Sequence, residues 1–180
     1  GGLGADDLRG YGLSTGTDSH LDTVSYAYVG SLNSVTVDLS AGSGLVTVGT
    51  DTSDTDTLTG FENVIGGAGA DNITGSSVAN IIKAGSGADI ITGGAGADDL
   101  QGEAGNDTFK ATSATDGADI IDGGIDSDTV DYSSATGPLD VTVVSGAATI
   151  TIDGTDTLTN IENLTGTASG DSITGDSNNN

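Results

Sequence analysis

The chain of 180 residues contains no cysteine, no methionine and no tryptophan, and it has a single proline. The absence of cysteine excludes disulfide bonds and thiolate metal sites. No apolar run approaches the length of about 18 residues that a membrane span needs. The basic residues Arg9, Lys83 and Lys110 are isolated, which opposes nucleic-acid binding. Four tyrosines and no tryptophan leave little aromatic surface for stacking against sugars.

What the chain does contain is glycine and aspartate. It has 31 glycines, and 27 acidic residues against 3 basic ones give a formal net charge of −24. Only Glu62, Glu103 and Glu162 are glutamates, so the acidity is almost entirely aspartate. The short aspartate side chain suits tight turns and rigid cation sites. High charge with few aromatics is also typical of disorder. An ordered structure is therefore expected only if the sequence contains a repeating pattern.

Such a pattern occupies residues 66–110, which divide into five units of nine residues. The units read GGAGADNIT, GSSVANIIK, AGSGADIIT, GGAGADDLQ and GEAGNDTFK. The sixth position is Asp71, Asn80, Asp89, Asp98 and Asp107, and the eighth is Ile73, Ile82, Ile91, Leu100 and Phe109. A unit with one large apolar side chain cannot bury a core alone, so units must stack. Each is expected to form a glycine turn and a very short strand, with two units in a coil of eighteen residues.

This stacking brings the acidic side chains together on each side of the coil. Asp71, Asp89 and Asp107 fall on one side, and Asn80 and Asp98 on the other. Successive coils lie about 4.8 Å apart, so bare carboxylates would repel one another. A hard cation that accepts many oxygen ligands fits between the turns, and Ca²⁺ suits them better than Mg²⁺, which requires a smaller and stricter octahedron.

The units match the nonapeptide G-G-x-G-x-D-x-U-x, and the segment resembles the calcium-binding repeats of RTX (hemolysin-type) proteins. The resemblance implies an all-β parallel β-roll with several Ca²⁺ ions in its Gly/Asp turns. The ligands it implies are Asp71, Asp89, Asp98, Asp107, Asp119, Asp128 and Asn80, with backbone carbonyls of the turn glycines Gly67, Gly69, Gly85, Gly87, Gly94, Gly96 and Gly105. The unit that contains Asn80 lacks two of the three glycines, so its site is expected to be weak or empty.

The pattern also divides the chain into a tandem array. We expect the end of a preceding β-roll in residues 1–9, a β-strand spacer in 10–63, the central calcium roll in 64–131, a second spacer in 132–163 and the start of a further roll in 164–180. Asp22-Thr-Val-Ser-Tyr26 in the first spacer corresponds to Asp128-Thr-Val-Asp-Tyr132 in the second. Residues 111–116 are an insertion, after which Asp119 and Asp128 are expected to stack on Asp98 and Asp107.

The spacers show alternating β-branched residues, including Val35, Val37, Val46 and Val48, which indicate strands longer than those of the roll. The strand at Val24 is expected to extend to Tyr28. We expect each spacer to form a solenoid coil on the axis of the roll, and a small antiparallel sandwich is the alternative.

One motif points weakly to catalysis. Gly12-Leu-Ser14-Thr-Gly16 matches the pattern G-x-S-x-G, which requires a strand, a sharp turn and a helix around the serine. No helical pattern surrounds it, and the only histidine, His20, follows too closely for that fold. No catalytic and no organic cofactor-binding residues are expected, and we interpret the chain as a non-enzymatic module.

The resulting hypothesis is a calcium-binding module that folds outside the cell and supports secretion and stability of a larger exported bacterial protein. The resemblance implies type I secretion and an extracellular location, either secreted or on the cell surface. Calcium is the expected partner, together with flanking domains of the same longer chain. Two alternatives stay open: an adhesive or structural repeat module, and an accessory module of a polysaccharide-modifying enzyme.

Overall fold

The computed structural model describes residues 7–9, 21–40, 44–49, 55–111, 117–144, 147–151 and 155–174. Residues 12–16, His20, the acidic residue of the first nonapeptide and residues 112–116 of the insertion lie outside this part of the chain. Within it the structure is all-β, with strands and turns and no helix. The described residues therefore contain no helix of the length and apolarity needed to cross a membrane.

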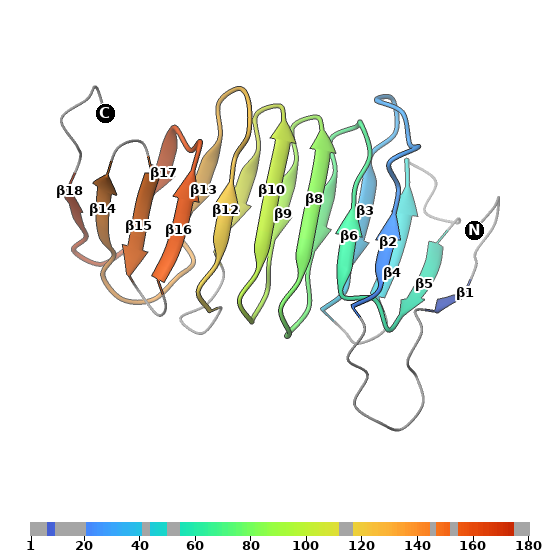
Figure 1. Ribbon diagram of the computed structural model, residues 1–180, viewed down its shortest axis with the longest axis horizontal. Coiled ribbons are helices and arrows are strands. Elements are labelled where there is room, and N and C mark those ends of the chain that lie inside the picture. The colour runs from blue at the N-terminus through green and yellow to red at the C-terminus, as the bar shows by residue number, and fades with distance from the viewer. Residues whose placement is uncertain are drawn as a thin grey trace.

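Eighteen strands form two nine-stranded sheets (Figure 1). The first sheet has the order β1 (Asp7–Arg9), β5 (Thr55–Thr59), β4 (Gly44–Val48), β3 (Val35–Asp38), β7 (Asn72–Thr74), β9 (Ile90–Thr92), β11 (Thr108–Lys110), β13 (Thr129–Asp131) and β17 (Asn163–Thr165). The second has the order β18 (Ser172–Thr174), β14 (Asp140–Val144), β15 (Ala147–Thr151), β16 (Thr155–Thr159), β12 (Ile120–Asp122), β10 (Asp99–Ala104), β8 (Ile81–Ser86), β6 (Asn63–Ile65) and β2 (Thr23–Ser25).

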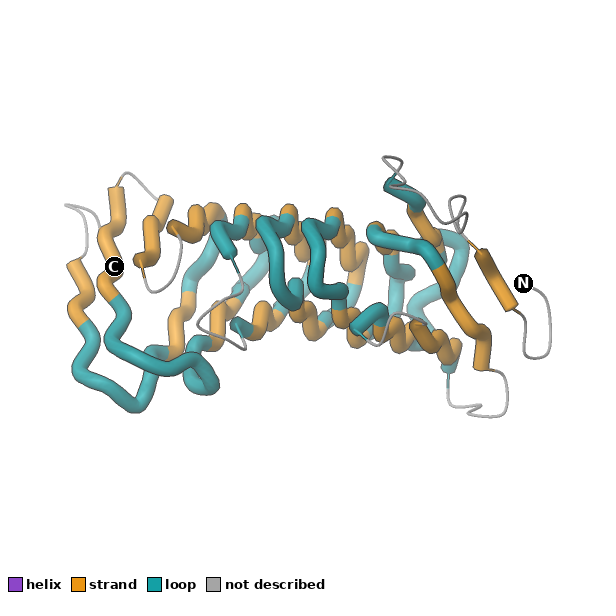
Figure 2. The backbone as a smooth tube through the Cα atoms, turned by 90° about the horizontal axis from the view of Figure 1, so that it is seen from below, coloured by secondary structure: helices purple, strands orange, loops and turns teal. Residues whose placement is uncertain are grey.

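The central strands β6 to β13 alternate between the two sheets and pair in parallel, as a β-roll requires. In the first sheet Ile91 lies in register with Ile73 and Phe109, two residues that belong to the coils before and after it. Figure 2 shows the two layers of strands with turns connecting them. Each strand points one large apolar residue inward, so stacking the coils builds a continuous core from units that have none alone.

The insertion leaves this register intact. Leu100 pairs with Ile121 and Phe109 with Val130, although 21 residues rather than 18 separate the partners. The register of these pairs is the one that the sequence predicted for Asp119 and Asp128.

The spacers join the same two sheets, but as antiparallel meanders. β3, β4 and β5 pair antiparallel within the first sheet, and β14, β15 and β16 do so within the second. Their outer strands remain parallel to the neighbouring strands, through β3 with β7 and β12 with β16. The spacers are therefore not separate sandwiches; they continue the two sheets of the roll, with antiparallel strands within each meander. The connections within each meander are too short for a parallel crossover of a dozen or more residues.

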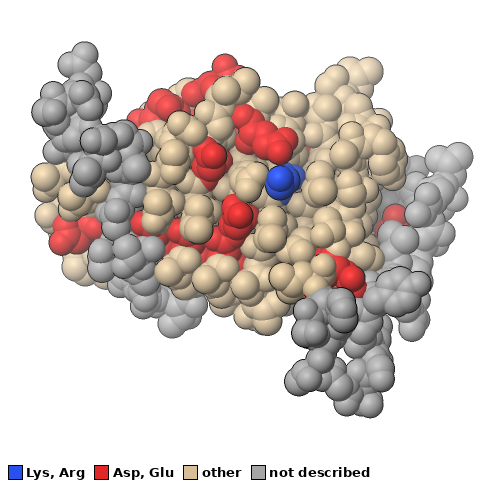
Figure 3. Space-filling model, viewed as in Figure 1, with Lys and Arg blue, Asp and Glu red and all other residues tan. Residues whose placement is uncertain are grey.

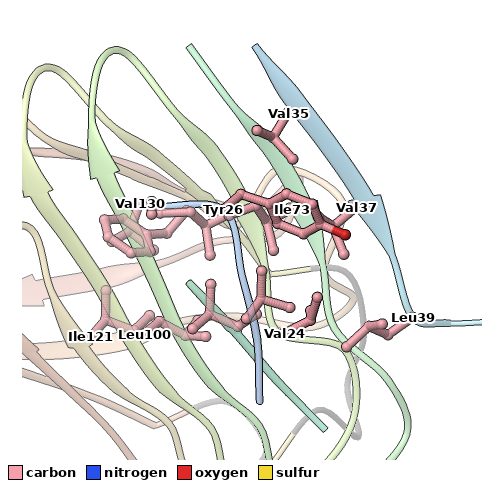
Figure 4. Packing of buried hydrophobic residues seen from close by; sticks show 14 of the residues in the cluster. Val24, Tyr26, Val35, Val37, Leu39, Ile73, Leu100, Ile121 and Val130 are labelled. Atoms are coloured by element: carbon pink, nitrogen blue, oxygen red, sulfur yellow. The ribbon is translucent and has the colours of Figure 1, made fainter. Parts of the chain in front are cut away.

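The core is one cluster that runs through both the roll and the spacers. Figure 4 shows the side chains of Val24, Tyr26, Val35, Val37, Leu39, Ile73, Leu100, Ile121 and Val130 packed between the strands. The expectation of a strand reaching Tyr28 is wrong. β2 ends at Ser25, Tyr26 turns into the core, and Tyr28 is 78% exposed because a turn closed by the Val29 N–H and the Tyr26 carbonyl at 2.8 Å carries it outward.

The adjacent residues Ile90 and Ile91 test which side chains of the roll point into the core. Ile91 is fully buried between the sheets, whereas Ile90 points outward and is partly exposed. Ile91→Ala should lower the free energy of unfolding in saturating calcium by about 2–5 kcal/mol, since it leaves a cavity in the core. Ile90→Ala is the control and should cost about 1 kcal/mol or less, because its side chain faces solvent. Equal losses in denaturant titrations of the two variants would contradict the assignment of the faces.

Candidate metal centres

The acidic side chains that end the turns form two rows, one along each side of the roll. Row one contains Asp71, Asp89, Asp107 and Asp128, and row two contains Asn80, Asp98, Asp119 and Asp156. In row one the backbone N–H groups of Asp71, Asp89 and Asp107 donate to Oδ1 of the next row member at 2.7, 2.9 and 2.8 Å. Row two repeats this bond at 2.8, 2.9 and 3.0 Å. The predicted site residues are thus brought together, coil over coil.

Every member of both rows is buried, with at most 8% of its surface exposed. In row one, Oδ2 of Asp89, Asp107 and Asp128 is also buried, and no group in the described part of the chain donates a hydrogen bond to it. An unsatisfied buried carboxylate oxygen is costly, and it indicates a missing positive partner. These three oxygen atoms fit a cation that lies between successive coils.

The units that end in Asp107 and Asp128 begin with a glycine that lies beside that oxygen, whereas the unit that ends in Asp89 begins with Ala84. A Cβ added to Gly102 would contact Asp107 Oδ2 and the carbonyl of Gly123 in the next coil. A Cβ on Gly123 would likewise contact Asp128 Oδ2 and the carbonyl of Asn160. Glycine therefore keeps open a space lined by a carboxylate oxygen and a backbone carbonyl, which are the ligands that Ca²⁺ prefers.

Five of the seven expected turn glycines adopt a left-handed backbone conformation, and Gly67 and Gly69 do not. Gly85 and Gly87 have φ of 110° and 136°, which side chains rarely adopt, and Gly94, Gly96 and Gly105 are similar. Glu103 and Asp126 adopt positive φ in equivalent places without being glycine. No group of three Asp, Glu, His or Cys side chains converges among the described residues.

Comparison with known families agrees with this geometry. The family model of the RTX calcium-binding nonapeptide repeat matches residues 56–77, 74–109 and 113–134, in four copies. These matched segments are RTX calcium-binding repeats. No curated protein sequence matches the chain significantly.

The turns that end in an aspartate are of two kinds in the structure. In the turn of residues 66–71, Asp71 Oδ2 accepts the N–H of Gly67 and its Oδ1 accepts the N–H of Val35, both at 2.7 Å. The turn of residues 166–171 closes similarly, through the N–H of Thr167 at 3.0 Å. In such turns protein N–H groups satisfy both carboxylate oxygens, whereas the turns that end in Asp89, Asp107 and Asp128 leave one oxygen without a donor among the described residues.

The rows extend beyond the residues that the sequence indicated. Asp156 Oδ1 accepts the N–H of Asp119, and Glu162 Oε2 accepts the N–H of Asp128 at 2.8 Å. The duplication of the spacer was the signal for both, because Glu62 occupies the place of Glu162 in the first copy and accepts the N–H of Asp22. The first-position glycines, Gly66, Gly75, Gly93, Gly102 and Gly123, were also missed, although they begin the repeat itself.

Burial makes the row-one carboxyls weak acids. It raises the pKa of Asp89 to about 6 and that of Asp107 to about 7, with the neighbouring carboxylates adding to the effect and backbone N–H donors opposing it. Burial is also the main cause that raises the pKa values of Asp71 and Asp128. Without a cation, the folded state therefore favours protonated carboxyls.

The pH dependence follows from these raised pKa values. A carboxyl whose pKa is higher in the folded state stabilises folding below its unfolded pKa, and that contribution is lost as the pH rises through the folded value. The calcium-stripped chain should therefore gain β structure between about pH 8 and about pH 4, as Asp107 and then Asp89 protonate. Circular dichroism without calcium measures this, and loss of β structure on acidification would contradict it. Calcium affinity should fall as the pH is lowered, because the ion requires the carboxylates in their ionised form.

Gly102→Ala tests the open space directly. Its Cβ would displace Asp107 Oδ2 and the Gly123 carbonyl, so calcium affinity should fall by on the order of tenfold. Gly30→Ala is the matched control, because a Cβ there has no neighbour within 4 Å. Calorimetric calcium titration compares the two, and an unchanged affinity in Gly102→Ala would show that the space holds no ion.

Proposed function

We propose that the chain is a calcium-dependent folding module of an exported protein. The observation that carries this is the set of three buried oxygens in row one, Oδ2 of Asp89, Asp107 and Asp128, that lack a donor in the described residues. The free energy of filling such sites is folding free energy when the sites do not exist in the unfolded chain. Calcium binding and folding are then one event.

The charge of the chain supports this coupling. Figure 3 shows acidic side chains spread across one face of the molecule, and the whole chain carries a formal net charge of −24. Such repulsion opposes the compact state. In the cytosol, where calcium is scarce, the chain remains extended and suited to type I export. Outside the cell, calcium neutralises the rows, and extracellular modules with Kd near 10⁻⁴–10⁻³ M are suited to such a switch.

The ions are held by row residues and by turn carbonyls. Asp89, Asp107 and Asp128 supply carboxylate oxygens in row one, and Asp98 and Asp119 do so in row two. Asp71 already accepts two N–H bonds, so its site requires the Gly67 N–H to be released and fills last. This proposal gives the chain no enzymatic role. The module is structural, and any enzymatic activity resides elsewhere in a longer extracellular protein.

We also propose the division of the chain stated from its sequence, with the central roll at residues 64–131 between two spacers and further rolls on either side. A second function, that of an adhesive or spacing module, is favoured by one feature. The meanders continue the sheets of the roll, so a tandem array forms one rod. The polysaccharide alternative has less support, because the hollow beside Leu21, Ile81 and Ile120 is lined by no aromatic or basic side chain.

Far-UV circular dichroism through a calcium titration tests the folding switch. We expect a cooperative gain of β signal with calcium, and no such gain with magnesium at the same concentration, because the turns offer carbonyl-rich and flexible sites. A full β signal in chelator near neutral pH would overturn the switch and favour the spacing module. A specific surface ligand for the isolated chain would favour adhesion.

A further inference from the structure

The turn of residues 75–80 differs from the others in the group that ends it. Its Asn80 is 1% exposed, and all the polar atoms of its amide have partners. Oδ1 accepts the N–H of Ser76 at 2.7 Å, while Nδ2 donates to the backbone carbonyl of Glu62 at 2.5 Å and to Ser76 Oγ at 3.1 Å. The amide thus closes its own turn and binds the last spacer residue before β6.

Only an amide satisfies both neighbours at once. The Ser76 N–H needs an acceptor and the Glu62 carbonyl needs a donor, and a carboxylate has no hydrogen to donate. An aspartate here would place one of its oxygens against the Glu62 carbonyl oxygen. Two buried oxygens in contact require a proton or a cation between them.

Asp71 shows the reverse case in a turn of the same kind. Both of its oxygens face donors, the N–H groups of Gly67 and Val35, so a carboxylate suits that position. The residue that ends each of these two turns therefore carries the hydrogen-bonding group that its partner in the spacer requires. Aspartate meets an N–H, and asparagine meets a carbonyl.

We propose that the Asn80 amide takes the place of a calcium ion at the start of row two. This inference rests on the proposed calcium function. The Nδ2 hydrogens supply the positive charge that an ion would supply to the Glu62 carbonyl, so the roll attaches to the first spacer without metal. Asn80→Asp would then create a calcium site where the native chain has none.

The far end of row two shows a second substitute for a cation. The Tyr132 hydroxyl donates to Asp156 Oδ2 at 2.7 Å, which satisfies the oxygen that remains open in Asp89, Asp107 and Asp128. Row two is thus closed at both ends by donors from the protein.

Counting bound calcium in variants of the whole chain tests the inference. In calorimetric titration, Asn80→Asp should bind one more ion per chain than the native protein. Asn72→Asp is the charge-matched control: Asn72 is exposed in β7, so the same added charge should leave the count unchanged. In a calcium titration that starts from the calcium-free chain, Asn80→Asp should require more calcium to fold than Asn72→Asp does.

A variant with a complete repeat keeps the test decisive if Asn80→Asp does not fold. Combining Asn80→Asp with Ser76→Gly and Val78→Gly gives the complete G-G-x-G-x-D pattern, which residues 93–98 in the next turn of row two also have. This variant should fold in calcium with one additional ion. A folded aspartate variant with the native count would overturn the inference. Absence of calcium binding by the native chain itself would instead overturn the proposed function, so the two failures are distinguishable.

Discussion

The structure depends on a carboxylate that acts as one rung of a parallel β ladder. Asp107 shows the arrangement: its Oδ1 accepts the N–H of Asp89, its N–H donates to Asp128 Oδ1, and its carbonyl accepts the N–H of Thr129. The side chain continues the hydrogen bonding of the strand into the turn. One oxygen is used in this way, and the other is left beside a first-position glycine. Carboxyl groups therefore accumulate in a buried row, and this accumulation supports the proposed dependence of folding on a cation.

The nine-residue period was enough to predict this part of the molecule. It fixed the inward column, since Ile73, Ile91 and Phe109 can share a core only if their strands stack in register. It also fixed the position of Asp128 over Asp107 across the insertion, because the turn chemistry, rather than the number of residues between, sets the alignment. Predicting the ladder required only a repeating local motif, and the period supplied that.

The spacers were harder, because their signal is ambiguous in a physical sense. Alternation such as that of Val35 and Val37 places side chains on two faces but is the same for parallel and antiparallel strands. Pairing direction depends on loop length and on which neighbour is available, and both are set by the rest of the fold. The exposure of Tyr28 has the same origin, since β2 ends at Ser25, three residues before the alternation ends. The partners of Asn80 were equally hidden, because its amide is explained by a carbonyl eighteen residues away.

The duplication carries one more constraint, which concerns parity. Each meander adds two extra strands to a single sheet, β3 to β5 in the first and β14 to β16 in the second. Every step between the meanders changes sheets, and an even number of strands, β6 to β13, separates β5 from β14. The second meander therefore falls in the opposite sheet, and both sheets reach nine strands. One nonapeptide more or fewer would place both meanders in one sheet, and that sheet would outgrow its partner by several strand spacings of about 4.8 Å. The two rows could not then remain aligned along the roll, so the number of repeats is tied to the spacers that flank them.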